Sequence, residues 1–178
     1  MAHATLNGIS MTSSNPIAVI ANRDHPDAQI LLTTAARQWR TAGHAVVGLV
    51  AADDTSGGPC SAGHLYDIAS GKQYSIQLEQ TPPGTSCHLD NGGVADAGAA
   101  IPAQIDTADV VILSKFGKLE SQQQGLWPAF AAAMAAGKPV LTTVSDKHEG
   151  AFKAFAPTAV WLDAAQPAIK QWWHSLQA

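Results

Sequence analysis

Two lysines flank a glycine in the segment 114–120, Ser-Lys-Phe-Gly-Lys-Leu-Glu, an arrangement suited to binding an anion. Lys115 and Lys118 supply positive charge, and backbone N–H groups near Gly117 can donate to the same anion. A magnesium-dependent nucleotide hydrolase would need an acidic residue where Ser114 and Lys115 stand, to hold the metal. A solvated surface loop is the alternative. The predicted ligand contacts in this segment are Ser114, Lys115, Phe116, Gly117, Lys118 and Glu120.

The segment 22–29, Asn-Arg-Asp-His-Pro-Asp-Ala-Gln, follows an apolar run and occupies the place of a phosphate-binding loop. It contains neither the glycines nor the lysine of the G-x-x-x-x-G-K-[ST] motif. Asp24 and Asp27 would repel phosphate, and capping of the next helix is their simpler role. Arg23 and His25 are candidates for ligand contact, because helix N-termini bind anions.

The two cysteines of the chain each lie close to a histidine. Cys60, His64, Cys87 and His88 could together supply four ligands to zinc or another transition metal, although their spacing is not that of a zinc finger. Buried or capping roles are the alternative, since free cysteine usually behaves as a small hydrophobe. A third interpretation is a reactive thiolate at Cys87, just before a predicted helix. Two cysteines cannot form a disulfide framework, so a reducing cytoplasm is expected.

Short apolar runs that alternate with helical patterns must position these residues. Such an alternation predicts an α/β fold with a mostly parallel sheet. The predicted strands cover residues 16–21, 45–52, 108–113 and 139–144, with an edge strand at 159–162. The clearest predicted helices cover residues 30–42, 126–136 and 166–176, and a short one covers 146–155.

The middle of the chain departs from this alternation. Residues 64–69 and 73–78 flank Ser70-Gly71-Lys72, so they predict a β-hairpin inserted at the edge of the sheet. The segment 90–105 is expected to be helical from about residue 93, weakened by a glycine and a proline within it.

Four loops follow the predicted parallel strands, where open α/β sheets bind ligands. They are residues 22–29, 53–63, 114–125 and 145–149.

Composition excludes several classes of protein. The chain has 178 residues, with 10 Lys and Arg against 14 Asp and Glu, so its net charge of -4 argues against nucleic-acid binding. No apolar run approaches the ~18 residues of a membrane span. The first residues lack the pattern of a secretory signal, so the cytoplasm is the predicted location. We expect a disordered lead-in at 1–14 and a single domain at 15–178.

Five segments are similar to a known family. They are residues 42–49, 65–71, 87–90, 115–120 and 137–142, and in order they cover about residues 16–156. The chain resembles bacterial domain-of-unknown-function family 2478, which tends to accompany molybdate-transport and nitrogenase-type genes. The Cys-x-Leu-Asp and Lys-Phe-Gly-Lys-x-Glu segments are the specific ones.

That family is in turn similar to small P-loop nucleoside triphosphatases, which carry Asp-Glu-Ile-Gly-Lys-Met-Glu at the position of residues 114–120. Gly117, Lys118 and Glu120 match, whereas the metal-binding acid pair and the phosphate loop are missing. The resemblance implies a three-layer P-loop-like fold without the nucleotide and Mg²⁺ machinery, so nucleotide hydrolysis is not expected.

The leading hypothesis is a cytoplasmic protein that binds a small oxyanion or metal species linked to molybdenum metabolism. Its ligand would be molybdate, tungstate or a transition metal. A divergent nucleotide-dependent hydrolase or transferase is one alternative, with Glu120 as base or Mg²⁺ ligand and Lys118 on phosphate. The others are the cysteine–histidine site, and an assembly or regulatory partner without a ligand. For Trp172-Trp173, core packing is the simpler interpretation, and a partner-binding patch, for instance of a homo-oligomer such as a homodimer, is the alternative.

Overall fold

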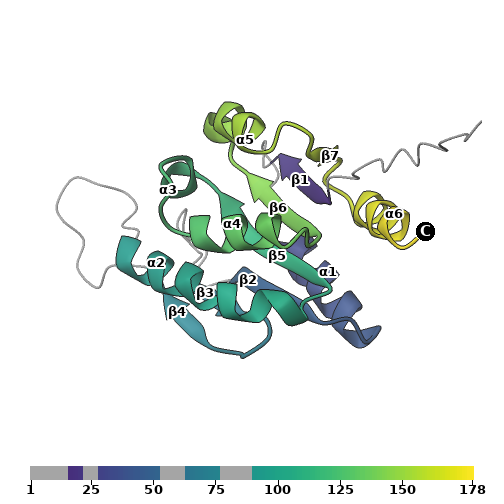
Figure 1. The fold of residues 1–178 in the computed structure, drawn as a ribbon, viewed down its shortest axis with the longest axis horizontal. Coiled ribbons are helices and arrows are strands. Elements are labelled where there is room, and N and C mark those ends of the chain that lie inside the picture. The colour runs from purple at the N-terminus through teal and green to yellow at the C-terminus, as the bar shows by residue number, and fades with distance from the viewer. Residues whose placement is uncertain (1–15, 22–27, 53–62, 77–89) are drawn as a thin grey trace, which may run out of the picture.

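The protein forms one seven-stranded sheet of strand order β4-β3-β2-β5-β6-β1-β7 (Figure 1). The computed structural model describes residues 16–21, 28–52, 63–76 and 90–178. Five strands run parallel, and β3 and β4 are added antiparallel at one edge. The strands are β1 Ile17–Ala21, β2 Val46–Ala52, β3 His64–Asp67, β4 Gln73–Ser75, β5 Val110–Phe116, β6 Val140–Val144 and β7 Val160–Leu162.

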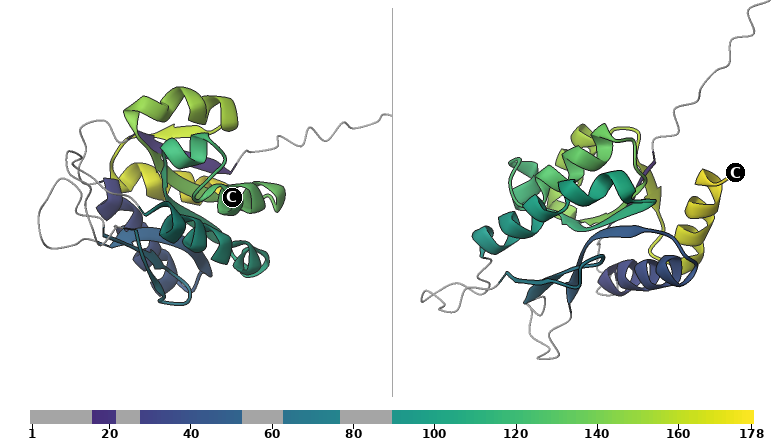
Figure 2. Two further views of the ribbon diagram at one scale, coloured as in Figure 1. Left: turned by 90° about the vertical axis from the view of Figure 1, so that its left-hand side faces the viewer. Right: turned by 60° about the horizontal axis from the view of Figure 1, so that its bottom comes forward.

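Helices cover both faces of this sheet (Figure 2). They are α1 Ala28–Thr41, α2 Asn91–Ala100, α3 Lys118–Ser121, α4 Trp127–Ala135, α5 Glu149–Phe155 and α6 Gln166–Leu176, with 3-10 helices at Pro102–Thr107 and Asp146–His148. Helices α1 and α6 pack on one face, and α2, α4 and α5 pack on the other. The predicted three-layer α/β fold with a mostly parallel sheet and an inserted hairpin is therefore confirmed.

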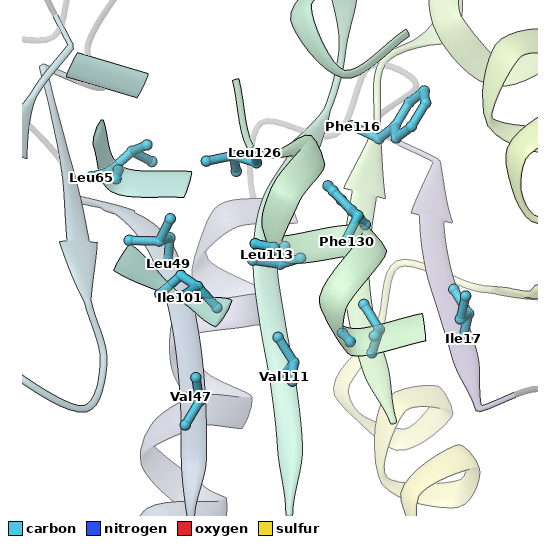
Figure 3. Close-up of a cluster of buried hydrophobic side chains, with 14 of the residues drawn as sticks. Ile17, Val47, Leu49, Leu65, Ile101, Val111, Leu113, Phe116, Leu126 and Phe130 are labelled. Atoms are coloured by element: carbon cyan, nitrogen blue, oxygen red, sulfur yellow. The ribbon is translucent and has the colours of Figure 1, made fainter. Parts of the chain in front are cut away.

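The central strands are largely apolar because both of their faces are buried, and their polar residues are Ser114 and Lys115 near the end of β5 and Thr142 and Thr143 in β6. In β5, Val111 and Leu113 point toward α2 and α4, whereas Ile112 points toward α1 and α6. The sheet thus has an apolar layer on each face, one under α2, α4 and α5 and the other under α1 and α6. Figure 3 shows the layer under α2 and α4, from Val47 at one end of the strands to Leu65 and Leu126 at the other. These two layers hold the carboxyl ends of the strands in a fixed arrangement.

The connections that leave the neighbouring strands β1 and β6 run in opposite directions across the sheet, from β1 toward β2 and from β6 toward β7. Helix α1 leaves β1 over one face of the sheet, and α5 leaves the neighbouring strand β6 over the other. Open α/β sheets bind ligands outside the carboxyl ends of their strands at such a reversal. The topology therefore directs attention to the ends of β1, β6 and β5.

The structure differs from the sequence-based expectations near residue 114. Strand β5 continues to Phe116, and α3 occupies residues 118–121, so the predicted loop 114–125 was wrong over much of its length. Pro102 begins a 3-10 helix rather than continuing α2. The predicted lead-in 1–14, most of the loops 22–29 and 53–63, and residues 77–89 lie outside the described residues. No helix in the described part has the length and apolar character needed to cross a membrane.

Candidate functional site

A cleft of about 530 Å³ lies at the carboxyl ends of β5 and β6. The end of β5 and the start of α3 provide its middle, the turn after β6 provides one side, and β3, the residue after β4 and the start of α2 provide the other. Its polar lining residues include Ser114, Lys115, Lys118, Glu120, Ser145 and His148.

A β-bulge between Leu113 and Phe116 bends the end of β5 toward this cleft. Leu113 pairs with Thr142 and Phe116 pairs with Val144, so β5 has one more residue than β6 over this interval. Such bulges bend a strand and redirect its side chains. The side chain of Lys115 is exposed between two buried neighbours, and Lys118 is exposed at the start of α3. Both lysines therefore present their ammonium groups at an open surface.

Phe116 has a structural role, although the sequence analysis placed it among the ligand contacts. Its side chain is 1% exposed and lies beside Phe130 in the apolar layer (Figure 3). Its ring also packs against Phe152 and stacks on Phe155, at centroid distances of 5.2 and 5.4 Å. Phe116 is not among the residues that line the cleft, and it instead anchors the end of β5 in the core.

Glu120 holds the backbone on two sides of the cleft. Its Oε2 accepts a hydrogen bond from the N–H of Gly117 at 3.0 Å, and its Oε1 accepts one from the N–H of Leu126 at 2.9 Å. The side chain is 5% exposed, and burial raises the pKa of its carboxyl. The backbone donors and the charge of Lys115 act in the opposite direction, and burial outweighs them.

Two glycines allow the chain to pass close to Glu120. A Cβ on Gly125 would lie 2.6 Å from Glu120 Oε1, and this residue has a φ of +62°. A Cβ on Gly98 of α2 would lie 2.4 Å from the carbonyl oxygen of Gly125. Only glycine fits either position without a shift of the backbone, so α2, the turn at Gly125 and the Glu120 carboxyl form one packed unit.

Hydroxyl groups lie at the ends of both central strands. The Oγ of Ser114 donates to Oε1 of Gln29 at 2.5 Å, which ties β5 to the first turn of α1. The Oγ of Ser145 lies 2.7 Å from Nδ1 of His148, and both residues line the cleft. This contact orients the imidazole and leaves Nε2 as its second polar atom.

The cleft brings together five residues of the predicted site, namely Ser114, Lys115, Gly117, Lys118 and Glu120. Arg23 and His25 lie outside the described residues, as do Cys60, Cys87 and His88. His64 is exposed on β3. Within the described part of the chain, no three His, Cys, Asp or Glu side chains gather as a metal site would require.

Three residues in or beside the cleft were not predicted from the sequence, namely Ser145, His148 and Gln29. Ser145 and His148 lie in the fourth of the predicted ligand-binding loops, and their Ser-x-x-His spacing after a buried strand was the available signal. Gln29 carries no such signal, because its contact with Ser114 joins residues 85 positions apart.

Comparison with known proteins finds similarity both in sequence and in fold. A Bradyrhizobium diazoefficiens protein named molybdenum import ATP-binding protein ModC 2 is 32% identical over 163 residues, which are 90% of this chain. The chain spans 18% of that relative's length.

The solution structure of a human cancer-related nucleoside triphosphatase superimposes with a TM-score of 0.63. That match covers 83% of this chain and 87% of the other, at 14% identity, and it shows a shared fold. A family model matches residues 17–172, and the chain therefore belongs to the family described as "Protein of unknown function (DUF2478)".

Proposed function

We propose that this domain is a cytoplasmic binding module for a small anion, an oxyanion linked to molybdenum metabolism, and that it binds this anion in the cleft at the ends of β5 and β6. The observation that supports the proposal is the pair of exposed lysines, Lys115 and Lys118, at the middle of the cleft. Binding of an oxyanion needs positive charge and several hydrogen-bond donors, and this cleft offers both.

The charge balance of the cleft favours an anion. Among the described residues that line it, Glu120 is the single carboxyl group. Both of its oxygens already accept backbone hydrogen bonds, and burial raises the pKa of this carboxyl. The two ammonium groups are therefore poorly compensated within the cleft, and an anion placed there would meet net positive charge.

Neutral donors are available on two sides of the same cleft. The hydroxyls of Ser114 and Ser145 can reorient to donate to a ligand. His148 can donate through Nε2 while Nδ1 remains on Ser145. Because Ser145 has one hydroxyl hydrogen, it donates either to the ligand or to Nδ1 of a neutral His148. Two lysines and two neutral donors at a time, Ser114 Oγ with either Ser145 Oγ or His148 Nε2, could then satisfy the four oxygens of a tetrahedral oxyanion.

The link to molybdenum comes from the relative rather than from the cleft. The relative that matches 90% of this chain bears a name that refers to molybdenum import. This supports molybdate, or its close analogue tungstate, as the first ligands to test.

Titration calorimetry of the intact protein with molybdate, tungstate, sulfate and phosphate tests the proposal. We expect saturable binding of at least one oxyanion and a loss of at least tenfold in affinity in the double variant Lys115→Ala/Lys118→Ala, because each lost charge contact is worth about 1 kcal/mol or more. The matched control is Lys72→Ala/Lys170→Ala, which removes the same net charge at two exposed lysines outside the cleft. Equal affinity in both double variants would contradict the proposal.

Nucleotide-dependent chemistry is the second candidate, and the shared fold with a nucleoside triphosphatase favours it. The segment after β1 lacks the glycines and lysine of a phosphate loop, which weighs against it. Titration with ATP and GTP in the presence of Mg²⁺ separates the two candidates. Tight nucleotide binding together with no response to any inorganic oxyanion would favour the second.

A further inference from the structure

The wall of the cleft beside α2 is apolar, in contrast to its lysine-bearing middle. Leu65 of β3, Ile76 just after β4, Val94 of α2 and Leu126 before α4 all line this wall. None of the four is more than 7% exposed, so they form a recessed surface rather than a projecting patch. Figure 3 shows Leu65 and Leu126 above Leu49 and Leu113, at the end of the apolar layer that borders the cleft.

The cleft is also much larger than a bare oxyanion. Four oxygen atoms fill on the order of 100 Å³ if each is given roughly the ~30 Å³ share of a water molecule. The cleft holds about 530 Å³, a size typical of pockets for organic ligands. An inorganic oxyanion on the lysines would leave most of this volume, and the whole apolar wall, without contact.

We propose that the cleft takes an organic anion, in which an oxyanion head group is carried on an apolar or aromatic body. This inference rests on the proposed function, since it assigns the head group to Lys115 and Lys118. The body lies on the wall formed by Leu65, Ile76, Val94 and Leu126.

Two amides at the rim of the apolar wall refine the chemistry of that body. Asn91 at the start of α2 and Gln124 before Gly125 line the same side of the cleft. Each offers both a donor and an acceptor. A body with one or two heteroatoms on its edge suits this wall better than a plain aliphatic chain.

Phenyl phosphate and inorganic phosphate are the probes that test the inference. At about pH 8 both are dianions, so the phenyl ring is the main difference between them. We expect phenyl phosphate to bind the intact protein about fivefold to tenfold more tightly, which corresponds to roughly 50 Å² of additional apolar burial. Methyl, ethyl and propyl phosphate should fall between the two in order of their apolar area.

Two valine variants test whether the phenyl ring lies on the apolar wall. Val94→Thr places a hydroxyl on the apolar wall at nearly constant volume, and it should reduce the advantage of phenyl phosphate to about twofold or less while leaving inorganic phosphate binding unchanged. The control is Val47→Thr, an equally buried valine at the far end of the strands (Figure 3). That variant should bind both probes as the unmodified protein does.

The outcomes separate this inference from the proposed function. If neither probe nor any oxyanion binds, the anion site itself is refuted, and this inference with it. If phosphate binds through the two lysines but phenyl phosphate binds no better, the inference alone is overturned. An advantage of phenyl phosphate that survives Val94→Thr would also overturn it, since the ring would then lie elsewhere. Should Val94→Thr fail to fold, the alkyl phosphate series on the unmodified protein decides.

Discussion

Replacement of Glu120 by alanine should strongly destabilise the domain. The carboxyl of Glu120 accepts the N–H groups of Gly117 and Leu126 at 3.0 and 2.9 Å, and its side chain is 5% exposed. Glu120→Ala leaves both donors without their acceptor. A buried unsatisfied N–H costs about 1–3 kcal/mol, so we expect the loss of both acceptors to lower the free energy of unfolding by about 2–6 kcal/mol. This is a large share of the 5–15 kcal/mol that is typical of a domain.

Denaturant unfolding, followed by far-ultraviolet circular dichroism, measures this loss. Glu120→Gln is the informative partner variant, because its amide oxygen can accept one of the two N–H groups while its NH₂ group faces the other. It should lose about half as much as Glu120→Ala. A loss below about 1 kcal/mol for Glu120→Ala would refute the reasoning, since water or a neighbouring group would then satisfy both donors.

The raised pKa of Glu120 adds a pH dependence with a definite sign. Burial raises the pKa of the folded protein's carboxyl above its ordinary value of 4.5, so the folded state retains a proton that the unfolded chain has released. The stability contributed by this group is fully present below 4.5 and is lost as pH rises through the folded pKa. As pH rises above 4.5 and through the folded pKa of Glu120, the unmodified protein should therefore lose stability relative to Glu120→Gln. Parallel curves for the two proteins would contradict this assignment.

Substitutions at Gly125, His148 and Asp67 test three separate contacts. Gly125→Ala should lower the free energy of unfolding in urea by about 2–4 kcal/mol, because its Cβ would clash with its neighbours and its φ is strained for alanine. The control is Gly137→Ala, at a φ of +63° with open space around it, and it should lose about 1 kcal/mol. His148→Asn keeps an acceptor near Nδ1 and removes the donor at Nε2, whereas His148→Gln does the reverse. Calorimetry should show weaker anion binding in the first variant, and equal weakening in both would contradict the role of Nε2. The Asp67 carboxylate accepts hydrogen bonds from two N–H groups of the hairpin turn and from Gln104 Nε2, at 2.8–3.1 Å. Asp67→Ala removes this acceptor and should lower the free energy of unfolding by about 2–4 kcal/mol. A loss under about 1 kcal/mol would show that the hairpin does not depend on Asp67.

The sequence predicted the parts of the fold that are dominated by local pattern. The four buried parallel strands were recognisable as apolar runs, and the hairpin β3–β4 was recognisable from Ser70-Gly71-Lys72. The terminal helix was predicted with the observed ends, Gln166–Leu176. These elements carry their own signals, because burial on one or both faces fixes the spacing of their apolar residues.

The end of β5 could not be predicted in the same way. Polar residues at 114 and 115 suggested that the strand stops at Leu113, whereas a bulge carries it on to Phe116. The aromatic cluster around Phe116 holds this extension, and it is built from Phe130, Phe152 and Phe155, which are distant in the sequence. Tertiary contacts therefore outweighed the local pattern.

The candidate site was predicted in part for a similar reason. Lys115, Lys118 and Glu120 carry an obvious chemical signal and lie on the short segment that the topology places at the strand ends. The partners that complete the cleft come from elsewhere in the chain, as with Ser145 and the apolar wall near Val94. Only the packed fold brings these groups together in one cleft at the carboxyl ends of the strands.

The location of a bound tungstate ion would show whether the cleft at the ends of β5 and β6 is the anion site. Tungsten scatters X-rays anomalously, so crystals soaked with tungstate would show where the anion lies. Anion binding in the cleft predicts one ordered tungsten there, with its oxygens within hydrogen-bond distance of the Nζ atoms of Lys115 and Lys118. Tungsten bound instead in the groove that contains Arg37 and Arg40, with the lysine cleft empty, would contradict it.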